Sequence, residues 1–581
     1  MADGDTPEPE EWHLGIEPGE HREAVPPPEV QPEPTVDLSA ARLDRPLYVL
    51  TAEHLGWIII AVYAIASRMI ALGARPLSPA ESRAALGALT LARDGIGTLS
   101  AHPEMHLTWI EVAQVWIFSL LGASDWTARL AFALCGLLLV ATALAMRPYA
   151  GRAGALALAA MLALSPSITW FSRSGEAAVP ALAFAMAAIA LMLSISHRPT
   201  MLRAVGLGCA SGIALASGPV GAGVMATAAI ALGMAGAWIA ITGADTWLAV
   251  RVWWTRRRLL VIVAAAATIA VWWLFESLFF ATSAVGVITD ELRSLAQGAT
   301  PWSLAGAAAF YAPMLGFYEF GIVIVALAGL VAVVGGRVRS RFAAWTLLWT
   351  LASVGAILAL PAHRTEMVVA MCVPMALLGA CGVEWLHHSP GWSVARYAAA
   401  AIGALTLYGQ VLTNVVYAAP DASEAPWHRH AVLFWTDPAT TIQAPAECAH
   451  AEASIEAADR SAAVSDDLPE IQWYLRDSAA TDAASATIVA APAPRDAGLA
   501  EENLAVRVFG VEETWSPDLH ALTPGAAVRY LFTAQAWSAI EIRDAELRVQ
   551  ASAKSSAPTV IVAPPSQPSP VPSPSPTPAA P

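Results

Sequence analysis

The sequence has little charge and almost no lysine. Charged residues make up 14% of the 581 positions, and Lys554 is the single lysine in a basic set made otherwise of arginine. The formal net charge of −15 comes mainly from the two ends of the chain, so it describes solvated tails and argues against nucleic acid as a partner. Apolar residues fill 56% of the sequence, above the average of soluble domains. The composition therefore predicts a polytopic α-helical membrane protein.

Cysteine is scarce as well. Of the five cysteines, Cys448 lies in polar sequence, and the other four lie in apolar runs at Cys135, Cys209, Cys372 and Cys381. These positions match neither the spacing of a zinc site nor a disulfide framework. We expect no cysteine chemistry.

Both ends of the chain lack apolar periodicity. Residues 1–45 are acidic and Pro-rich, without the basic start and small-residue cleavage site of a signal peptide. We expect a disordered cytoplasmic tail there. Residues 551–581 end in "APPSQPSPVPSPSPTPAAP", a Pro/Ser composition that favours extended polyproline conformations and builds no core. We expect a second disordered tail, a spacer or stalk.

Residues 50–417 form the predicted membrane domain. Apolar runs of roughly 20 residues, the length with which a helix crosses a bilayer, recur through this region. We predict about eleven transmembrane helices, at roughly 54–73, 127–146, 153–171, 177–195, 203–217, 220–241, 259–281, 309–334, 343–360, 366–386 and 394–417.

One further run, 106–122, decides the orientation. If it does not cross, the arginine-rich stretches "RPYAGR", "SHRPTMLR", "RVWWTRRR" and "GGRVRSR" all fall on one side, as the positive-inside rule requires of cytoplasmic loops. We therefore interpret 106–122 as a re-entrant or interfacial helix. This places the first outer loop, 74–126, outside a plasma membrane whose cytoplasmic side holds the N-terminus.

Residues 418–550 change character. Short β-like runs ("SATIVAAPA", "NLAVRVFGV", "VRYLFTA", "ELRVQA") are broken by Pro, Gly and Asp, with helix-like polar stretches between them. We predict a small extracytoplasmic α/β domain.

Ionisable residues gather at the predicted outer ends of the spans. Arginine holds phosphate well, and a nearby carboxylate suits the role of a base, so this pattern favours a phosphate-bearing lipid as substrate over a transporter with midplane charges. Glu81 is the catalytic candidate, and the binding candidates are Arg75, His102, Glu104, His106, Arg173, Glu176, His363 and Arg364.

Each of these residues also has a simpler interpretation. Arginines and glutamates at span ends are common membrane anchors. Glu81 fits the first turn of a helix that starts at Ser78–Pro79 and ends at Gly95. The run "HPEMH" resembles a metal site, but Pro103 breaks the helix on which its histidines would share a face. No cofactor is certain, and a divalent metal stays an alternative.

Three stretches in order carry a family resemblance. "RPLSPAESRAA", "HPEMHLTWIEVAQVWIFSLLGASDWTARLAFALCGLL" and "LALSPSITWFSRSGEAAVPALAF" resemble the family 39 glycosyltransferases, protein O-mannosyltransferase-like enzymes of the C-type fold. "DDLPEIQWYLRDS" and "VRVFGVEETWSPDL…VRYLFTAQAW" resemble the outer domain of the flippase-activity-associated subfamily linked to archaeal N-glycosylation. The resemblance covers about residues 50 to 550.

This resemblance implies transfer of a sugar from a polyprenyl-phosphate donor to a protein or glycan acceptor on the extracytoplasmic side. An acidic residue of the first outer loop is then the general base. The family has Asp-Glu in that loop, whereas this chain has Ala80-Glu81, so Glu81 is what remains of the pair. Glu176 stands where an Asp is usual. Arg173 and Arg364 are expected to hold the donor phosphate, and His102 and His106 to line the site.

The missing aspartate keeps a second hypothesis open: a non-catalytic family member that acts in flipping or export of lipid-linked sugars. A solute transporter is a weaker alternative, because no inverted repeat is visible. In the α/β domain, Asp466 and Asp467 are further candidates for substrate binding. We predict that one of them faces a cleft shared with the Glu81 loop, while Trp473 packs inward.

Overall fold

The computed structural model describes residues 51–95, 108–242, 246–276, 303–361, 363–389, 392–418, 439–441, 443–455, 460–481, 486–492, 504–515, 522–533, 538 and 541–550. The predicted tails, 1–45 and 551–581, lie outside the described residues, and so does "HPEMH".

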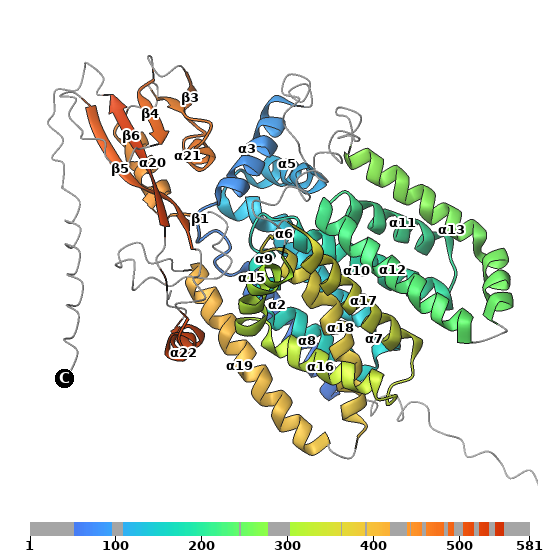
Figure 1. Ribbon diagram of the computed structural model, residues 1–581. Coiled ribbons are helices and arrows are strands. Elements are labelled where there is room, and N and C mark those ends of the chain that lie inside the picture. Colours follow the sequence, from blue (N-terminus) through green and yellow to red (C-terminus); the bar gives the residue numbers. More distant parts are fainter. Residues whose placement is uncertain are drawn as a thin grey trace, which may run out of the picture. The chain divides into compact units, whose positions relative to one another are not determined.

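Up to Ala418, every element that the described residues form is a helix (Figure 1). Its elements are α2 (Ala52–Met69), α3 (Pro79–Asp94), α5 (Trp109–Leu121), α6 (Asp125–Ala145), α7 (Arg147–Ala150), α8 (Arg152–Leu164), α9 (Pro166–Phe171), α10 (Ala178–His197), α11 (Met201–Leu215), α12 (Pro219–Thr242), α13 (Thr246–Glu276), α15 (Leu304–Phe317), α16 (Phe320–Val334), α17 (Arg341–Ala359), α18 (Met367–His387) and α19 (Trp392–Ala418).

A helix or a pair of helices lies at each predicted span. Six described helices are long and apolar enough to cross a membrane: α6, α10, α12, α13, α17 and α18. α15 and α16 together pass the same test but are bent by 100°. α5, at 13 residues, is only about 20 Å long, which is short for a crossing; its re-entrant or interfacial placement stays a prediction. The prediction of a polytopic helical membrane protein is confirmed.

Two predicted spans are broken, and one carboxylate joins the breaks. Span 153–171 divides into α8 and α9 because Ser165 caps α9, accepting from the N–H of Ile168, and Pro166 opens it. Span 309–334 bends between α15 and α16 at Glu319. The Oε1 of Glu319 accepts from the Ser165 hydroxyl at 2.7 Å and from the N–H of Ser167 at 2.9 Å. The short helix α9 is therefore fixed at its start.

Arginine-rich segments meet at one end of the helices. The ring of Tyr149 lies against the rings of His197 and Phe342, which brings "RPYAGR" next to the ends of α10 and α17. Arg257 donates to the carbonyl oxygen of Ser196 at 2.9 Å, which adds "RVWWTRRR" to the same end. These contacts bring arginine-rich stretches together at one end of the helices, and the side of the membrane that this end faces stays a prediction.

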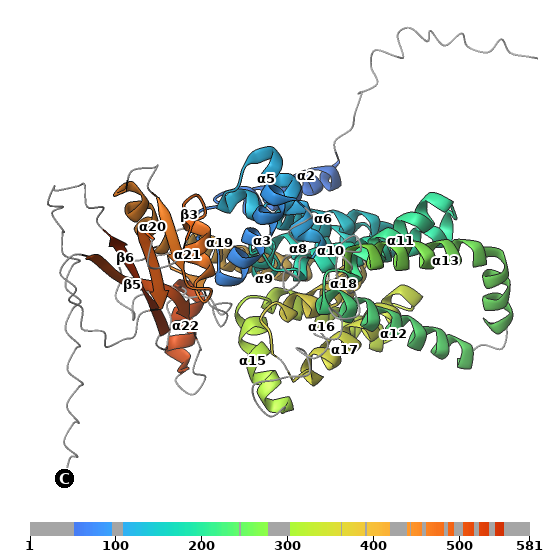
Figure 2. The same cartoon turned by 90° about the horizontal axis from the view of Figure 1, so that it is seen from above.

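α18 is the central helix of the membrane domain. In an apolar stretch of 18 residues of α18, 89% of the residues are buried, against 6% in the corresponding stretch of α13. α13 is therefore peripheral, and it lies beside α11 (Figure 2). α18 packs against both α16 and α17. α16 and α18 approach closely through the small residues Gly329, Gly379 and Gly382, as is common between membrane helices.

The C-terminal domain, residues 439–550, is built on a mixed six-stranded sheet. Its strands lie in the order β1-β5-β6-β4-β2-β3, with β2 parallel to β3 and β4 and the remaining pairs antiparallel. The elements are β1 (Ala439–Thr440), α20 (Gln443–Ala453), β2 (Ser461–Val464), α21 (Pro469–Tyr474), β3 (Ala479–Ala480), β4 (Ile488–Pro492), β5 (Leu504–Thr514), α22 (Pro524–Thr533) and β6 (Glu541–Gln550). The prediction of a small α/β domain is confirmed.

One strand prediction in this domain is wrong. "VRYLFTA", residues 528–534, reads as β because of its aromatic and β-branched residues, but 528–533 are the second half of helix α22. The start signal lies upstream. Thr523 accepts from the N–H of Ala526 at 3.2 Å, and Pro524 occupies the first helical position, where proline is tolerated.

The close approach of α16 and α18 predicts opposite effects for two Gly→Ala substitutions. A Cβ at Gly329 would lie 2.1 Å from the carbonyl oxygen of Leu378, whereas a Cβ at Gly355 of α17 meets nothing within 4 Å. We expect Gly329→Ala to lower the free energy of unfolding by about 1–3 kcal/mol through overpacking. Gly355→Ala should be neutral or raise it by up to about 1 kcal/mol through helix propensity. Thermal unfolding in detergent measures both, and equal melting temperatures would contradict the packing described.

Candidate functional site at the first loop

The first loop, residues 70–124, connects α2 to α6 and carries α3. The sequence dictates how α3 begins. Ser78 is its N-cap and accepts from the N–H of Glu81 at 3.2 Å, and the backbone N–H of Ser78 donates to Oε2 of Glu81 at 2.7 Å. This reciprocal capping box, with Pro79 at the first position, is encoded locally. The simpler interpretation of Glu81, an acid in a first helical turn, is therefore correct as far as it goes.

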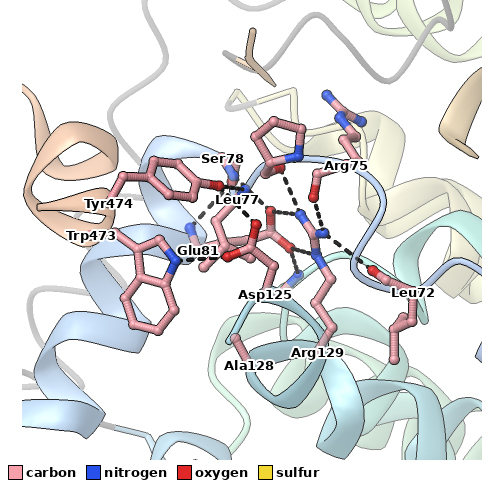
Figure 3. A network of polar contacts seen from close by, with 12 residues as sticks. Leu72, Arg75, Leu77, Ser78, Glu81, Asp125, Ala128, Arg129, Trp473 and Tyr474 are labelled. Carbon is pink, nitrogen blue, oxygen red and sulfur yellow. Dashed lines mark hydrogen bonds and ion pairs between the residues drawn. The ribbon is translucent and has the colours of Figure 1, made fainter. Parts of the chain in front are cut away.

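Glu81 also forms a buried ion pair with Arg129 of α6 (Figure 3). The Nε of Arg129 donates to Oε1 at 2.8 Å and its Nη2 donates to Oε2 at 2.7 Å. A third element joins through the backbone N–H of Gly175, which donates to Oε1 at 2.6 Å. Both ionic side chains are almost completely buried, with 6% of Glu81 and 2% of Arg129 exposed. The pair joins the first loop, α6 and the loop between α9 and α10.

The remaining donors of Arg129 fix the turn that precedes α3. Its guanidinium donates to the carbonyl oxygens of Leu72, Arg75 and Pro76, at 3.3, 2.6 and 2.9 Å. Arg129 was not among the predicted site residues. The sequence could have indicated Arg129, because it lies inside the apolar run "DWTARLAFALCG" and a buried cation requires a partner.

The environment of Glu81 decides what its carboxylate does chemically. Burial alone raises the pKa of Glu81, but the guanidinium of Arg129, the N–H of Ser78 and the nearby Arg75 bring the pKa below its usual 4.5. A carboxylate with a lowered pKa and all its hydrogen bonds made is a weak proton acceptor. Ala80, the preceding residue, is exposed, so position 80 faces away from the ion pair.

The other predicted arginines near the loop hold the backbone. Arg173 is buried and donates to the carbonyl oxygens of Ser67, Ile70 and Ala71. These groups lie at the C-terminal end of α2, where helix carbonyls lack intrahelical donors and favour a cation. Arg75 places its guanidinium 4.8 Å from the centre of the Trp170 ring, a cation–π contact. Both side chains thus have structural partners beside the Glu81–Arg129 pair.

His363 and Arg364 lie at the start of α18, in contact with α15. The His363 ring packs at 5.6 Å from that of Phe310, and the hydroxyl of Tyr311 donates to the carbonyl oxygen of Arg364 at 3.1 Å. The guanidinium of Arg364 is 39% exposed and lies 3.7 Å from the carboxylate of Glu366. Arg364 therefore presents part of its charge at the surface of the membrane domain.

The remaining predicted residues fall into two groups. His102, Glu104 and His106 lie outside the described residues. Asp466 and Asp467 are exposed, and Asp466 lines a cavity of about 700 Å³ whose lining residues all belong to the stretch 462–491 of the C-terminal domain. Among the residues that the structure describes, no three His, Cys, Asp or Glu side chains are placed to hold a metal ion.

The C-terminal domain contacts the first loop and the start of α6 through two aromatic residues of α21. The indole N–H of Trp473 donates to Oδ1 of Asp125 at 2.8 Å, and the hydroxyl of Tyr474 donates to Oδ2 at 3.0 Å. Tyr474 also accepts from the backbone N–H of Leu77 at 2.9 Å (Figure 3). Trp473 is fully buried and packs against Phe118 of α5, so it faces the first loop.

This contact reaches both halves of the ion pair. Asp125 lies one turn before Arg129 on α6, and Leu77 lies four residues before Glu81. The Tyr474 hydroxyl is hydrogen-bonded to both Asp125 and Leu77, so it links the segment that carries Arg129 to the segment that carries Glu81. The acids Asp466 and Asp467 were the expected link between the domain and the Glu81 loop, but the bonds described come from their aromatic neighbours.

Comparisons with known proteins bear on the fold. No protein-family model and no curated protein matches the sequence. Among solved structures, ArnT from Cupriavidus metallidurans bound to undecaprenyl phosphate is 16% identical with a TM-score of 0.53, over 86% of this chain and 98% of that chain. Its apo form has a TM-score of 0.48 at 16% identity, covering 85% and 98%. The archaeal oligosaccharyltransferase AglB from Archaeoglobus fulgidus, in complex with an inhibitory peptide and a dolichol-phosphate, has 0.43 at 12% identity, covering 75% and 65%.

The likeness to lipid-bound ArnT, at a TM-score of 0.53 over 98% of that chain, carries the fold argument. The chain shares the fold of ArnT, a bundle of apolar helices with a small sheet domain at the C-terminal end, which is the predicted fold class.

The buried pair predicts a pH-dependent loss of stability in Glu81→Gln. Removing one partner of a buried ion pair costs about 3–5 kcal/mol, so the melting temperature in detergent should fall. Arg83→Gln, on the exposed face of the same helix, is the matched control and should change little. Because the folded pKa of Glu81 lies below 4.5, the difference should be full above that pH and shrink as the pH falls further. An undiminished difference at low pH would contradict the lowered pKa.

Proposed function

We propose that this chain is a membrane glycosyltransferase that takes a sugar from a polyprenyl-phosphate donor and transfers it to a protein or glycan acceptor. The carrying observation is the fold, which matches nearly the whole length of ArnT, a protein solved with undecaprenyl phosphate bound. The order of the sequence motifs further supports family 39 and, within it, the flippase-activity-associated subfamily. Both assignments belong to the proposal.

In this proposal Glu81 is a positioning residue. Its oxygens accept from Arg129, Ser78 and Gly175, so taking a proton from an acceptor hydroxyl would require breaking an ion pair. The general base is then Glu176. It follows Gly175, whose N–H binds Glu81, and it is half-buried in the same loop. Glu176 is therefore a second carboxylate near the Glu81–Arg129 pair, and it takes no part in the capping box of α3.

The donor phosphate needs a cation that has room for it. Arg173 is buried on the carbonyl oxygens at the end of α2, whereas Arg364 is partly exposed and its contact to Glu366 is long, at 3.7 Å. A guanidinium binds phosphate in a bidentate manner, and the side chain of Arg364 can be reached from the surface. We therefore assign phosphate binding to Arg364 and keep His102, Glu104 and His106 as residues that line the site.

One observation favours a second function. The acid that remains in the first loop is locked in an ion pair, and the neighbouring position holds the exposed Ala80. A protein in this state binds the lipid-linked sugar without turning it over, as a member of a flipping or export assembly does. The two functions share the ligand and differ in turnover.

Substitution of Glu176 tests the enzyme against the non-catalytic alternative. We expect purified protein in proteoliposomes to consume a radiolabelled polyprenyl-phosphate hexose. Glu176→Gln should slow transfer by about 10²–10⁴-fold, the usual contribution of a general base, while native mass spectrometry still shows bound lipid. Asp477→Asn, which removes an exposed carboxylate from a surface ion pair, is the control and should transfer at the wild-type rate.

The outcomes separate the hypotheses. Bound lipid with no turnover in the wild type favours the non-catalytic function. Full turnover in Glu176→Gln refutes the assignment of the base but leaves the reaction standing. Absence of both binding and turnover overturns the proposal.

We further propose that the C-terminal domain is extracytoplasmic and the arginine-rich end of the helices is cytoplasmic, in the plasma membrane. Asp477 and Ser340 are both exposed, the first on the C-terminal domain and the second before α17. In intact cells a membrane-impermeant maleimide should label Asp477→Cys, and it should label Ser340→Cys only after permeabilisation. The reverse pattern would invert the orientation.

A further inference from the structure

Helix α22 of the C-terminal domain has a buried aromatic face and an exposed apolar face. One of its faces is buried through Tyr530, which is 2% exposed, while Val528 and Phe532 are 57% and 51% exposed. Val528 and Phe532 are four residues apart, so they stand on one face of the helix. Arg529 is exposed beside them. The helix thus presents two large apolar side chains and a cation away from its own domain.

The buried face of α22 rests on the membrane domain. The Tyr530 ring lies 5.2 Å from that of Phe317 and 5.6 Å from that of Trp515, and its hydroxyl is bonded to the hydroxyl of Tyr318. Phe317 and Tyr318 form the bend between α15 and α16. The helix is therefore held against the membrane domain by aromatic contacts.

The exposed face of α22 continues onto α19. The hydroxyl of Tyr408 donates to the carbonyl oxygen of Phe532 at 2.5 Å, and the two rings lie 5.9 Å apart. Tyr408 and the next turn of α19 are themselves exposed and apolar, with Tyr408 at 41% and Val411 at 47%. Exposed apolar side chains on a helix of a membrane domain face lipid. The surface of α22 is continuous with that lipid-facing surface.

We propose that α22 lies in the membrane–water interface, with Val528 and Phe532 inserted at the boundary of the acyl chains and Arg529 at the level of the lipid phosphates. Short amphipathic helices with an apolar face and flanking basic residues bind in this manner. Tyrosine and tryptophan gather at the same depth in membrane proteins, and here Tyr318, Tyr408 and Trp515 contact residues of the helix.

In the described residues of the C-terminal domain, the exposed large apolar side chains are concentrated on α22. Among the described residues of the C-terminal domain, the large apolar side chains that are exposed are Val508, Val528 and Phe532, so two of the three belong to α22. A concentration of this kind marks a surface that is covered in the working protein. The lipid is the occupant that the contact with α19 supports. This inference is independent of whether the chain transfers a sugar.

Spin labels on α22 test the depth of the helix. Val528→Cys and Phe532→Cys are made in a Cys209→Ser background, because Cys209 is half-buried and the other four native cysteines are buried. Asp467→Cys, an exposed position of the same domain, is the control for water. Full-length labelled protein is reconstituted into vesicles of phosphatidylcholine and phosphatidylglycerol. Power-saturation EPR then compares collisions with oxygen, which partitions into lipid, and with a water-soluble nickel chelate.

We expect the ratio of oxygen to nickel collisions to be several-fold higher at positions 528 and 532 than at 467. A ratio equal to that at 467 would place the helix in water and overturn the proposal. Shielding from both reagents would overturn it in a different way, because it would show protein, a second copy or a partner, on this face.

A charge introduced on the apolar face gives a second measurement. Val528→Asp should expel the helix from the interface and raise amide hydrogen exchange in α22 several-fold in vesicles. Val508→Asp is the matched control, since Val508 is an exposed valine of the same domain on β5, and it should leave the exchange of α22 unchanged. Equal exchange in both variants would contradict a lipid-anchored helix.

Discussion

The ion pair between Glu81 and Arg129 is the constraint on which the candidate site depends. Two charges are almost fully buried, which costs free energy unless every donor and acceptor is used. The surrounding backbone meets this demand through Ser78, Gly175 and the carbonyl oxygens of the turn after α2. Because these groups come from three segments of the chain, none of the segments moves without leaving a buried charge unpaired.

Much of the membrane domain could be predicted from the sequence because hydrocarbon imposes a single solution on long apolar runs: a helix. The boundaries of α3 could also be predicted, because Ser78-Pro79 and Gly95 are local start and stop signals and the capping box needs only two residues three apart. The assignment of 106–122 as a re-entrant or interfacial helix stays a prediction. Prediction succeeded where the cause is local or set by the bilayer.

The sequence could not predict which distant residues pair with each other, or which surface each helix buries. Arg129 lies 48 residues from Glu81, and nothing local shows which carboxylate a buried arginine meets. Trp473 was expected to pack inward, but the sequence did not say whether inward meant its own domain or the first loop. In α22 the β-branched and aromatic residues that suggest a strand are divided between two helix faces, with Tyr530 buried and Val528 and Phe532 exposed, so tertiary packing outweighed local propensity.

The bond from Leu77 to Tyr474 spans 397 residues of sequence, and the bond from Trp473 to Asp125 spans 348. A ribosome therefore delivers the first loop long before its partners exist. During that interval the apolar surface that Trp473 later covers on α3 and α5 stands open. Trp473 covers this surface only after the C-terminal domain has been synthesised. The packing of the first loop therefore depends on a segment that is made hundreds of residues later.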